Sequence, residues 1–226
     1  MSNHIELKQA VSHLREIVFE EVDPQWQSST FEVCREFWPC DIMLLNSERL
    51  EFLAYCITNL NRLNPAWRSA MQQTSGDILI WAVNEGHLTL VKSLAQAGVD
   101  LNYQNHWLES AMMRACSKGR HEILAYLIKC GADPLLKDVG GQIALMLSAG
   151  AGESKCVEQA LTVEGLNARD KWLETAAMKA SRYGHKECLY HIVSAGADLT
   201  LQNSDGENVF DICSARGYFE CLEILN

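Results

Sequence analysis

The chain has 226 residues, of which 48% are hydrophobic and 21% charged, and its formal net charge is -10 at pH 7. This composition is typical of a folded protein, and the acidity argues against nucleic acid as the main partner because no basic face is implied. No stretch approaches the ~18 consecutive apolar residues of a membrane span, and the first residues lack the pattern of a secretory signal. We therefore expect a cytoplasmic protein with no membrane and no nucleic-acid partner.

The first 71 residues are helical by pattern. Residues 5–22 place apolar side chains on one face of an amphipathic helix, namely Leu7, Val11, Leu14 and Val18. Residues 51–57 (EFLAYCI) repeat much of 122–128 (EILAYLI). Residues 1–71 are therefore expected to form a helical N-terminal cap that includes one degenerate repeat, with its first helix near 38–46 and its second helix over 47–60. In an alternative interpretation the 5–22 helix is a separate docking element for a partner.

Glycines recur through the rest of the chain at intervals of 33, 33, 32 and 33 residues. They are Gly86, Gly119, Gly152, Gly184 and Gly217. A fixed period of this size indicates a solenoid, in which each unit buries its apolar face only by stacking on its neighbours.

One unit can be followed from its residues. Small and apolar side chains (111–116) predict a short helix that ends at Gly119, since glycine suits the left-handed position after a helix. A second helix follows, with an apolar stripe over 123–128, and Gly131 ends it. Each unit is thus a helix, a turn, a second helix and a projecting loop, which we call a finger.

Cysteine placement argues against disulfides and metal. Cys156, Cys188 and Cys221 lie four residues after a repeat glycine, where the earlier units have Leu90 and Ile123. A cysteine that alternates with leucine and isoleucine is expected to be a small buried hydrophobe. No Cys-x-x-Cys pair has zinc spacing, so we expect reduced thiols and no metal or cofactor.

These units resemble ankyrin repeats. The resemblance rests on Gly-His at 86–87 and 184–185, and on Gly-Ala/Val-Asp at 98–100, 131–133 and 196–198. It implies an all-α fold, an ankyrin-repeat solenoid of stacked helix-turn-helix units with short finger loops behind the helical cap. The array is expected over 72–226, with units at about 72–104, 105–137, 138–169, 170–202 and 203–226.

The chain departs from the family pattern in several places. The opening glycine of a unit is replaced by Ser75, Leu108 and Leu173, so those turns are expected to lack glycine geometry. The third unit ends without Gly-Ala-Asp (164–167), which predicts a shortened or bent finger. A methionine column should be buried: Met113, Met146 and Met178. The fifth unit is expected to be terminal, with a polar outer face supplied by Arg216, Glu220 and Glu223.

The resemblance implies that a protein partner binds the concave face, which is made of finger tips and exposed positions of the first helices. Carried over slot by slot, the expected partner-binding residues are His106, Trp107, Glu109, Lys118, Gln142, Lys171, Trp172, Glu174, Arg182 and Tyr183. No catalytic residue is assigned.

Two Trp-Leu-Glu triplets, 107–109 and 172–174, stand out among these positions. They recur two units apart, so stacked layers would place them roughly 20 Å apart on one side. Tryptophan is enriched at binding hot spots. In the other interpretation, the tryptophans fold back on Leu108 and Leu173 and stabilise fingers that have lost their glycine.

The sequence therefore predicts a protein-protein interaction module, not an enzyme, with no small-molecule substrate. The drifted repeats resemble bacterial ankyrin proteins, including effectors that act on a host protein in the host cytosol. An immunity-like or regulatory inhibitor that covers a toxin or enzyme active site is the alternative. A third possibility, from another class, is an enzyme with its chemistry in the N-terminal segment.

Overall fold

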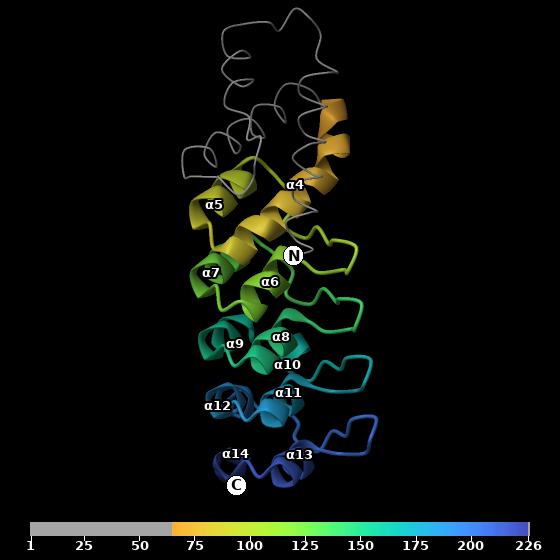
Figure 1. Ribbon diagram of the computed structural model, residues 1–226, viewed down its shortest axis with the longest axis vertical. Coiled ribbons are helices and arrows are strands. Elements are labelled where there is room, and N and C mark those ends of the chain that lie inside the picture. The colour runs from red at the N-terminus through yellow and green to blue at the C-terminus, as the bar shows by residue number, and fades with distance from the viewer. Residues whose placement is uncertain (1–64, 226) are drawn as a thin grey trace, which may run out of the picture. The chain divides into compact units, whose positions relative to one another are not determined.

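The computed structural model describes residues 65–225 of a chain that divides into two compact units, residues 1–105 and 106–226 (Figure 1). The helix expected at 5–22 and the degenerate repeat expected over about 38–60 lie outside the described residues. All regular elements described are α-helices; residues 65–225 contain no β-strand.

The described part of the first unit is a long helix followed by a short one. Helix α4 (Pro65–Glu85) ends at Gly86, whose φ is 84°, and packs on α5 (Leu88–Gln96). Ser75 lies inside α4, so the opening turn expected there is wrong. The boundary expected between residues 71 and 72 falls within the same helix and stays a prediction. A Cβ on Gly76 would fall 2.2 Å from the ring of Tyr103, so here glycine makes room for a neighbouring side chain and does not form a turn.

The second unit consists of four layers of two helices, numbered second to fifth after the repeats expected from the sequence. Each first helix packs on the first helix of the next layer, and the second helices do the same (Figure 1). The first helices are α6 (Ala111–Ser117), α8 (Ala144–Ala151), α11 (Ala176–Tyr183) and α13 (Val209–Arg216). The second helices are α7 (His121–Lys129), α9 (Ser154–Ala160), α12 (Lys186–Ser194) and α14 (Phe219–Leu225).

The repeat glycines have the conformation that their spacing predicts. Gly119, Gly152, Gly184 and Gly217 all have positive φ, between 64° and 79°. An L-residue with a Cβ would be strained there, whereas glycine ends the helix without that penalty. The expected all-α ankyrin solenoid is confirmed for this unit.

The methionine column is buried as expected, and two of its members also cap helices. Met113, Met146 and Met178 are each at most 1% exposed. The Ser110 Oγ accepts a hydrogen bond from Met113 N at 3.3 Å, while Met113 Sδ accepts one from Ser110 N at 3.4 Å. Thr175 and Met178 repeat this arrangement in α11. The methionine sulfur thus accepts the hydrogen bond from the N-cap amide that a glutamate side chain accepts in a capping box.

The irregular end of the third layer differs from expectation. The finger over 170–174 is not shortened; the change occurs before it. Helix α9 stops at Ala160, and one further helical turn, α10 (Val163–Leu166), follows, with Thr162 Oγ1 accepting from Gly165 N at 3.0 Å. In the last layer Arg216, Glu220 and Glu223 are exposed as expected, together with Phe219 at 73%.

The cysteines of the second helices are core residues, which confirms the expectation from their alignment. Cys156, Cys188 and Cys221 are each 1% exposed, as Leu90 and Ile123 are at 2% and 3%. Burial raises the pKa of each of these three thiols to about 11. They are therefore protonated and inaccessible at neutral pH.

We expect iodoacetamide to discriminate sharply among the cysteines of the described region. At pH 8 the native chain should react at Cys130, which is exposed, and not at the buried thiols, because alkylation needs an accessible thiolate. The protected set is Cys116, Cys156, Cys188, Cys213 and Cys221. Peptide mapping by mass spectrometry checks this, and rapid native labelling of Cys156 or Cys188 would contradict the packing.

Candidate functional site

The fingers of the second unit are joined edge to edge by backbone hydrogen bonds. Val139 N donates to Trp107 O at 3.1 Å, Lys171 N donates to Gly140 O at 3.0 Å, and Ser204 N donates to Trp172 O at 2.9 Å. The finger over 138–142 is therefore held between the two that carry tryptophan. Trp107 and Trp172 consequently lie on the same edge of the unit, where the fingers project beside the first helices (Figure 1).

A single acceptor side chain shapes each of three finger turns. Asp138 Oδ1 accepts from Gly140 N and Gln142 N, each at 2.8 Å. Asp170 Oδ1 accepts from the corresponding amides of Trp172 and Glu174, each at 2.9 Å. Asn203 does the same in the next finger. The turn is thus set by this residue and by the pairing between fingers.

The turns keep glycine geometry even where glycine is missing, so the expectation for these positions is wrong. Leu108 and Leu173 have φ values of 56° and 60°, in the same region as Gly141 at 78° and Gly206 at 79°. The two leucines are also exposed, at 45% and 42%. The sequence did not identify them as candidate site residues.

Both tryptophans expose about half of their surface. Trp107 is 54% exposed, and its ring lies 4.8 Å from that of His106. Trp172 is 52% exposed; its ring lies against Gly140 of the preceding finger, and Lys179 Nζ is 5.6 Å from its centroid, a cation–π arrangement. Trp172 therefore contacts the neighbouring layer and still offers a face to solvent.

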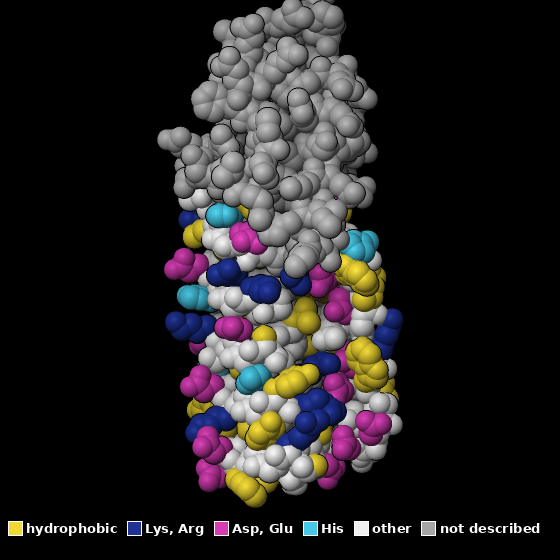
Figure 2. All heavy atoms as spheres, viewed as in Figure 1, with side chains coloured by type: hydrophobic (Ala, Val, Ile, Leu, Met, Phe, Trp, Pro, Cys, Tyr) yellow, Lys and Arg dark blue, Asp and Glu magenta, His cyan; other side chains and the backbone are white. Residues whose placement is uncertain are grey.

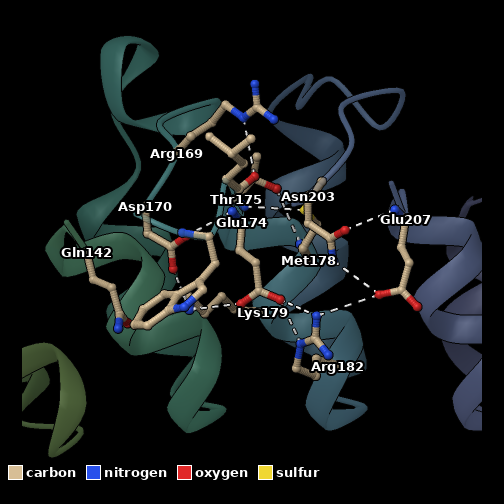
Figure 3. A network of polar contacts seen from close by, with 12 residues as sticks. Gln142, Arg169, Asp170, Glu174, Thr175, Met178, Lys179, Arg182, Asn203 and Glu207 are labelled. Atoms are coloured by element: carbon tan, nitrogen blue, oxygen red, sulfur yellow. Dashed lines mark hydrogen bonds and ion pairs between the residues drawn. The ribbon is translucent and has the colours of Figure 1, made fainter. Parts of the chain in front are cut away.

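Behind the Trp172 finger lies a buried network of charges (Figure 3). Lys179 Nζ is 2.7 Å from Asp170 Oδ2 and 3.0 Å from Glu174 Oε2. The other oxygen of Glu174 accepts from Arg182, whose Nε lies 2.7 Å away. Arg182 reaches on to Glu207 of the next layer at 3.9 Å. This network joins the fourth finger to α11 and to the fifth layer.

The charge of Lys179 is stabilised by its partners. Burial by itself lowers the pKa of Lys179, but hydrogen bonds and charge from Asp170 and Glu174 outweigh it and hold the pKa above its usual value. The lysine thus stays charged at neutral pH. Glu109 and Arg114, five residues apart like Glu174 and Lys179, form the equivalent pair in the second layer at 3.1 Å.

The ten expected partner-binding residues fall into three groups. His106, Trp107, Lys118, Lys171, Trp172 and Tyr183 are exposed. Glu109, Gln142 and Arg182 are half-buried. Glu174 is only 8% exposed and is committed to Lys179 and Arg182, so its expected place on the accessible surface is wrong.

A further exposed aromatic side chain lies at the end of α11. Tyr183 is 57% exposed, and its ring would lie 3.9 Å from a Cβ added at Gly150, near the end of α8. Figure 2 shows hydrophobic side chains in two places on the viewed face, along the edge with the fingers and over the first helices. Charged side chains of both signs lie beside them. The surface is suited to contacts with another macromolecule.

Within residues 65–225, no group of histidine, cysteine, aspartate or glutamate is arranged to hold a metal, and no described helix is long and apolar enough to cross a membrane. The stacked layers of two helices, joined by paired fingers, define a helical repeat protein.

Comparison with known families gives this class a name. A model of ankyrin repeats in three copies matches residues 43–138, 79–162, 115–203 and 145–226. The chain belongs to the ankyrin-repeat family. Ankyrin repeats are protein-interaction modules, so its partners are proteins in general terms.

Several characterised relatives share this region. The chain is 26% identical to the E3 ubiquitin-protein ligase KEG of Arabidopsis thaliana over 82% of its length, but over only 11% of that protein. It is 29% identical to the human SH3 and multiple ankyrin repeat domains protein 2 over 60% of its length and 8% of the relative. The NF-kappa-B inhibitor cactus of Drosophila melanogaster is 35% identical over 44% of the chain and 19% of cactus. The chain spans only a small part of these proteins.

Proposed function

We propose that the chain binds a folded protein through the finger edge and concave face of residues 106–226. The observation that carries this proposal is the pairing of the fingers, which sets two half-exposed tryptophans on one edge with one finger between them. Half-exposed tryptophan is costly to leave in water and is enriched at binding hot spots. His106, Lys118, Lys171 and Tyr183 are the other fully exposed candidates for contact with the partner.

The finer role we propose is that of an effector that acts on a host protein in the cytosol. The relatives named above come from a plant, a human and a fly, which supports recognition of a eukaryotic protein. The alternative, a regulatory inhibitor that covers an active site, is favoured by the likeness to cactus, whose name is that of an inhibitor. Capture of one enzyme or toxin whose activity then falls would support the inhibitor. Capture of a eukaryotic partner that stays active would support the effector.

Replacing Trp107 and Trp172 together by alanine should reduce capture of the partner at least about tenfold, which corresponds to the loss of a single hot spot. The thermal midpoint should fall by less than about 3 °C, because both side chains are half-exposed and lose few core contacts. The measurement is affinity purification of wild type and variant from eukaryotic cells, followed by mass spectrometry.

Tyr190→Ala is the matched control. Tyr190 is an exposed aromatic residue at 58%, but it lies on α12 among the second helices. Its replacement should leave capture unchanged. Undiminished capture by the double tryptophan variant would refute the proposed function, and a large fall in its thermal midpoint would assign the tryptophans to finger stability instead.

A further inference from the structure

The fifth finger carries an exposed serine whose hydroxyl takes no part in folding it. This finger precedes α13 and is the lowest in Figure 1. Ser204 and Asp205 are the central residues of its turn, which Gly206 N closes by donating to Asn203 O at 3.1 Å. Ser204 is exposed, and its backbone N donates to Trp172 O in the neighbouring finger. No hydrogen bond among residues 65–225 uses its Oγ, so the hydroxyl is open to an enzyme.

The residues after Ser204 are those that an acid-directed protein kinase selects. Asp205 follows at the first position and Glu207 at the third. Asp205 is exposed, and the side chain of Glu207 is 38% exposed. A kinase of this class recognises its substrates by charge, through cations that receive the acids after the serine. The other exposed serines and threonines of residues 106–225 lack an acid at both positions: Ser194, Thr200 and Ser214.

Two cations of the fourth finger lie beside Ser204, and neither has a carboxylate partner among residues 65–225. The Arg169 guanidinium donates to Gln202 O, two residues before Ser204. Lys171 is exposed and directly precedes Trp172, whose carbonyl accepts from Ser204 N. Because a backbone carbonyl carries only a partial charge, both cations remain free to pair with an anion.

The acids near Ser204 oppose a phosphate less than these cations favour it. Asp205 is exposed and would repel a phosphate, but repulsion between groups in water is screened by salt. Glu207 already shares its Oε2 with Arg182 at 3.9 Å. A guanidinium binds phosphate through two parallel hydrogen bonds, which adds directional contacts to the attraction of charge. A phosphate on Ser204 is therefore expected to turn toward Arg169.

We propose that an acid-directed kinase phosphorylates Ser204, that Arg169 pairs with the phosphate, and that this modification switches off capture of the partner. In the transfer Ser204 Oγ bonds to the γ-phosphorus of ATP, whose bond to the β-phosphate oxygen breaks. ADP leaves, and the hydroxyl proton passes to the catalytic aspartate of the kinase. The switch rests on the proposed function, because a hydrated dianion beside Trp172 would have to lose water where the partner docks. The modification itself does not rest on it.

The first test treats the full native chain with casein kinase II and ATP, followed by peptide mapping with mass spectrometry. Within residues 106–225 the phosphate should appear on Ser204, and Ser204→Ala should remove that signal. Asp205→Asn/Glu207→Gln should slow the modification at least about tenfold, because the acids that the kinase recognises are lost. Glu223→Gln removes an exposed acid of the same layer and is the matched control, with no expected change. An unmodified Ser204 would overturn the proposal.

The second test locates the phosphate by phosphorus NMR titration of the phosphorylated chain, in which the Ser204 signal is the one that Ser204→Ala removes. The second pKa of phosphoserine is ordinarily about 6, and a neighbouring cation lowers it by favouring the dianion. That pKa should be higher by at least about 0.5 in Arg169→Gln than in wild type. Arg169→Lys, which keeps the charge, should stay close to wild type, as should the control Arg216→Gln on α13. Equal values in wild type and Arg169→Gln would overturn the pairing.

The third test uses the purified chain, with or without kinase treatment, to capture the partner from a eukaryotic lysate that contains phosphatase inhibitors. Phosphorylated wild type should capture at least about tenfold less than the untreated chain, whereas kinase-treated Ser204→Ala should keep its capture. Undiminished capture by the phosphorylated chain, with capture still lost in Trp107→Ala/Trp172→Ala, refutes the switch and leaves the proposed function standing. Capture that survives the double tryptophan variant refutes the proposed function and the switch together.

Discussion

Asp170→Ala is expected to lower the free energy of unfolding by about 3 to 5 kcal/mol, because it leaves the buried charge of Lys179 without its nearest partner. Lys179 is 9% exposed and lies 2.7 Å from Asp170 Oδ2. The finger also loses the acceptor for the amides of Trp172 and Glu174. Urea denaturation followed by circular dichroism measures the loss.

Asp138→Ala separates the two effects. Asp138 accepts the same pair of finger amides, through Gly140 and Gln142, so its removal should cost about 2 kcal/mol for two hydrogen bonds. The further loss of unfolding free energy in Asp170→Ala, beyond that in Asp138→Ala, is then the part due to Lys179. Asp170→Ala/Lys179→Met should recover most of that excess, since replacing a buried ion pair by apolar groups is often neutral. Equal losses at both aspartates would show that the charge network contributes nothing.

Gly152→Ala should lower the free energy of unfolding by about 3 kcal/mol, through two causes that add. Gly152 ends α8 with a φ of 79°, so alanine is strained there. The new Cβ would also fall 2.8 Å from the ring of His185, whose Nε2 lies 3.2 Å from Gly150 O. The methyl group must therefore displace a ring that links the fourth layer to the third.

Gly196→Ala is the matched control for backbone strain alone. Gly196 has a φ of 88°, and a Cβ there would meet nothing within 4 Å. Its replacement should cost about 1 to 2 kcal/mol. The difference between the two variants measures the packing of His185 against α8. Thermal melts that give the same midpoint for both would contradict this contact.

The repeat period and the buried columns could be predicted from the sequence because they are repeated. Cys156 and Cys188 align with Leu90 and Ile123, and all four are buried. A position that holds cysteine in one repeat and leucine or isoleucine in another is expected to be a core position, because cysteine behaves there as a small hydrophobic residue. Comparing the same position in successive repeats of one chain therefore identifies which residues are buried.

The errors came from rules applied to single residues. Glycine is not a requirement of the finger turn, because the acceptor Asp170 and the pairing of Lys171 N with Gly140 O hold that turn with Leu173 in the left-handed region. Tertiary hydrogen bonds outweighed the local preference. A turn was expected at Ser75, but the chain runs on through Ser75 and Gly76 as one helix, because isolated glycine is tolerated inside a helix.

The candidate site could be predicted only in outline. Trp107 and Trp172 are exposed, as their position in the repeat predicts. Glu174 is buried because it pairs with Lys179 and Arg182, which follow about one and two helical turns later in the sequence. One sequence signal was present. Trp-Leu-Glu is followed five residues later by a cation in both units, Arg114 and Lys179, and a recurrent pair of this kind indicates that the glutamate has a partner.

The central claim, that the finger edge recognises a protein, is tested most directly by hydrogen–deuterium exchange of the full chain with and without the partner that it captures. The amides of residues 106–110, 138–142 and 170–174 should exchange more slowly in the complex, while those of α7, α9 and α12 should keep their rates. Protection on the second helices, with the three fingers unchanged, would contradict the account.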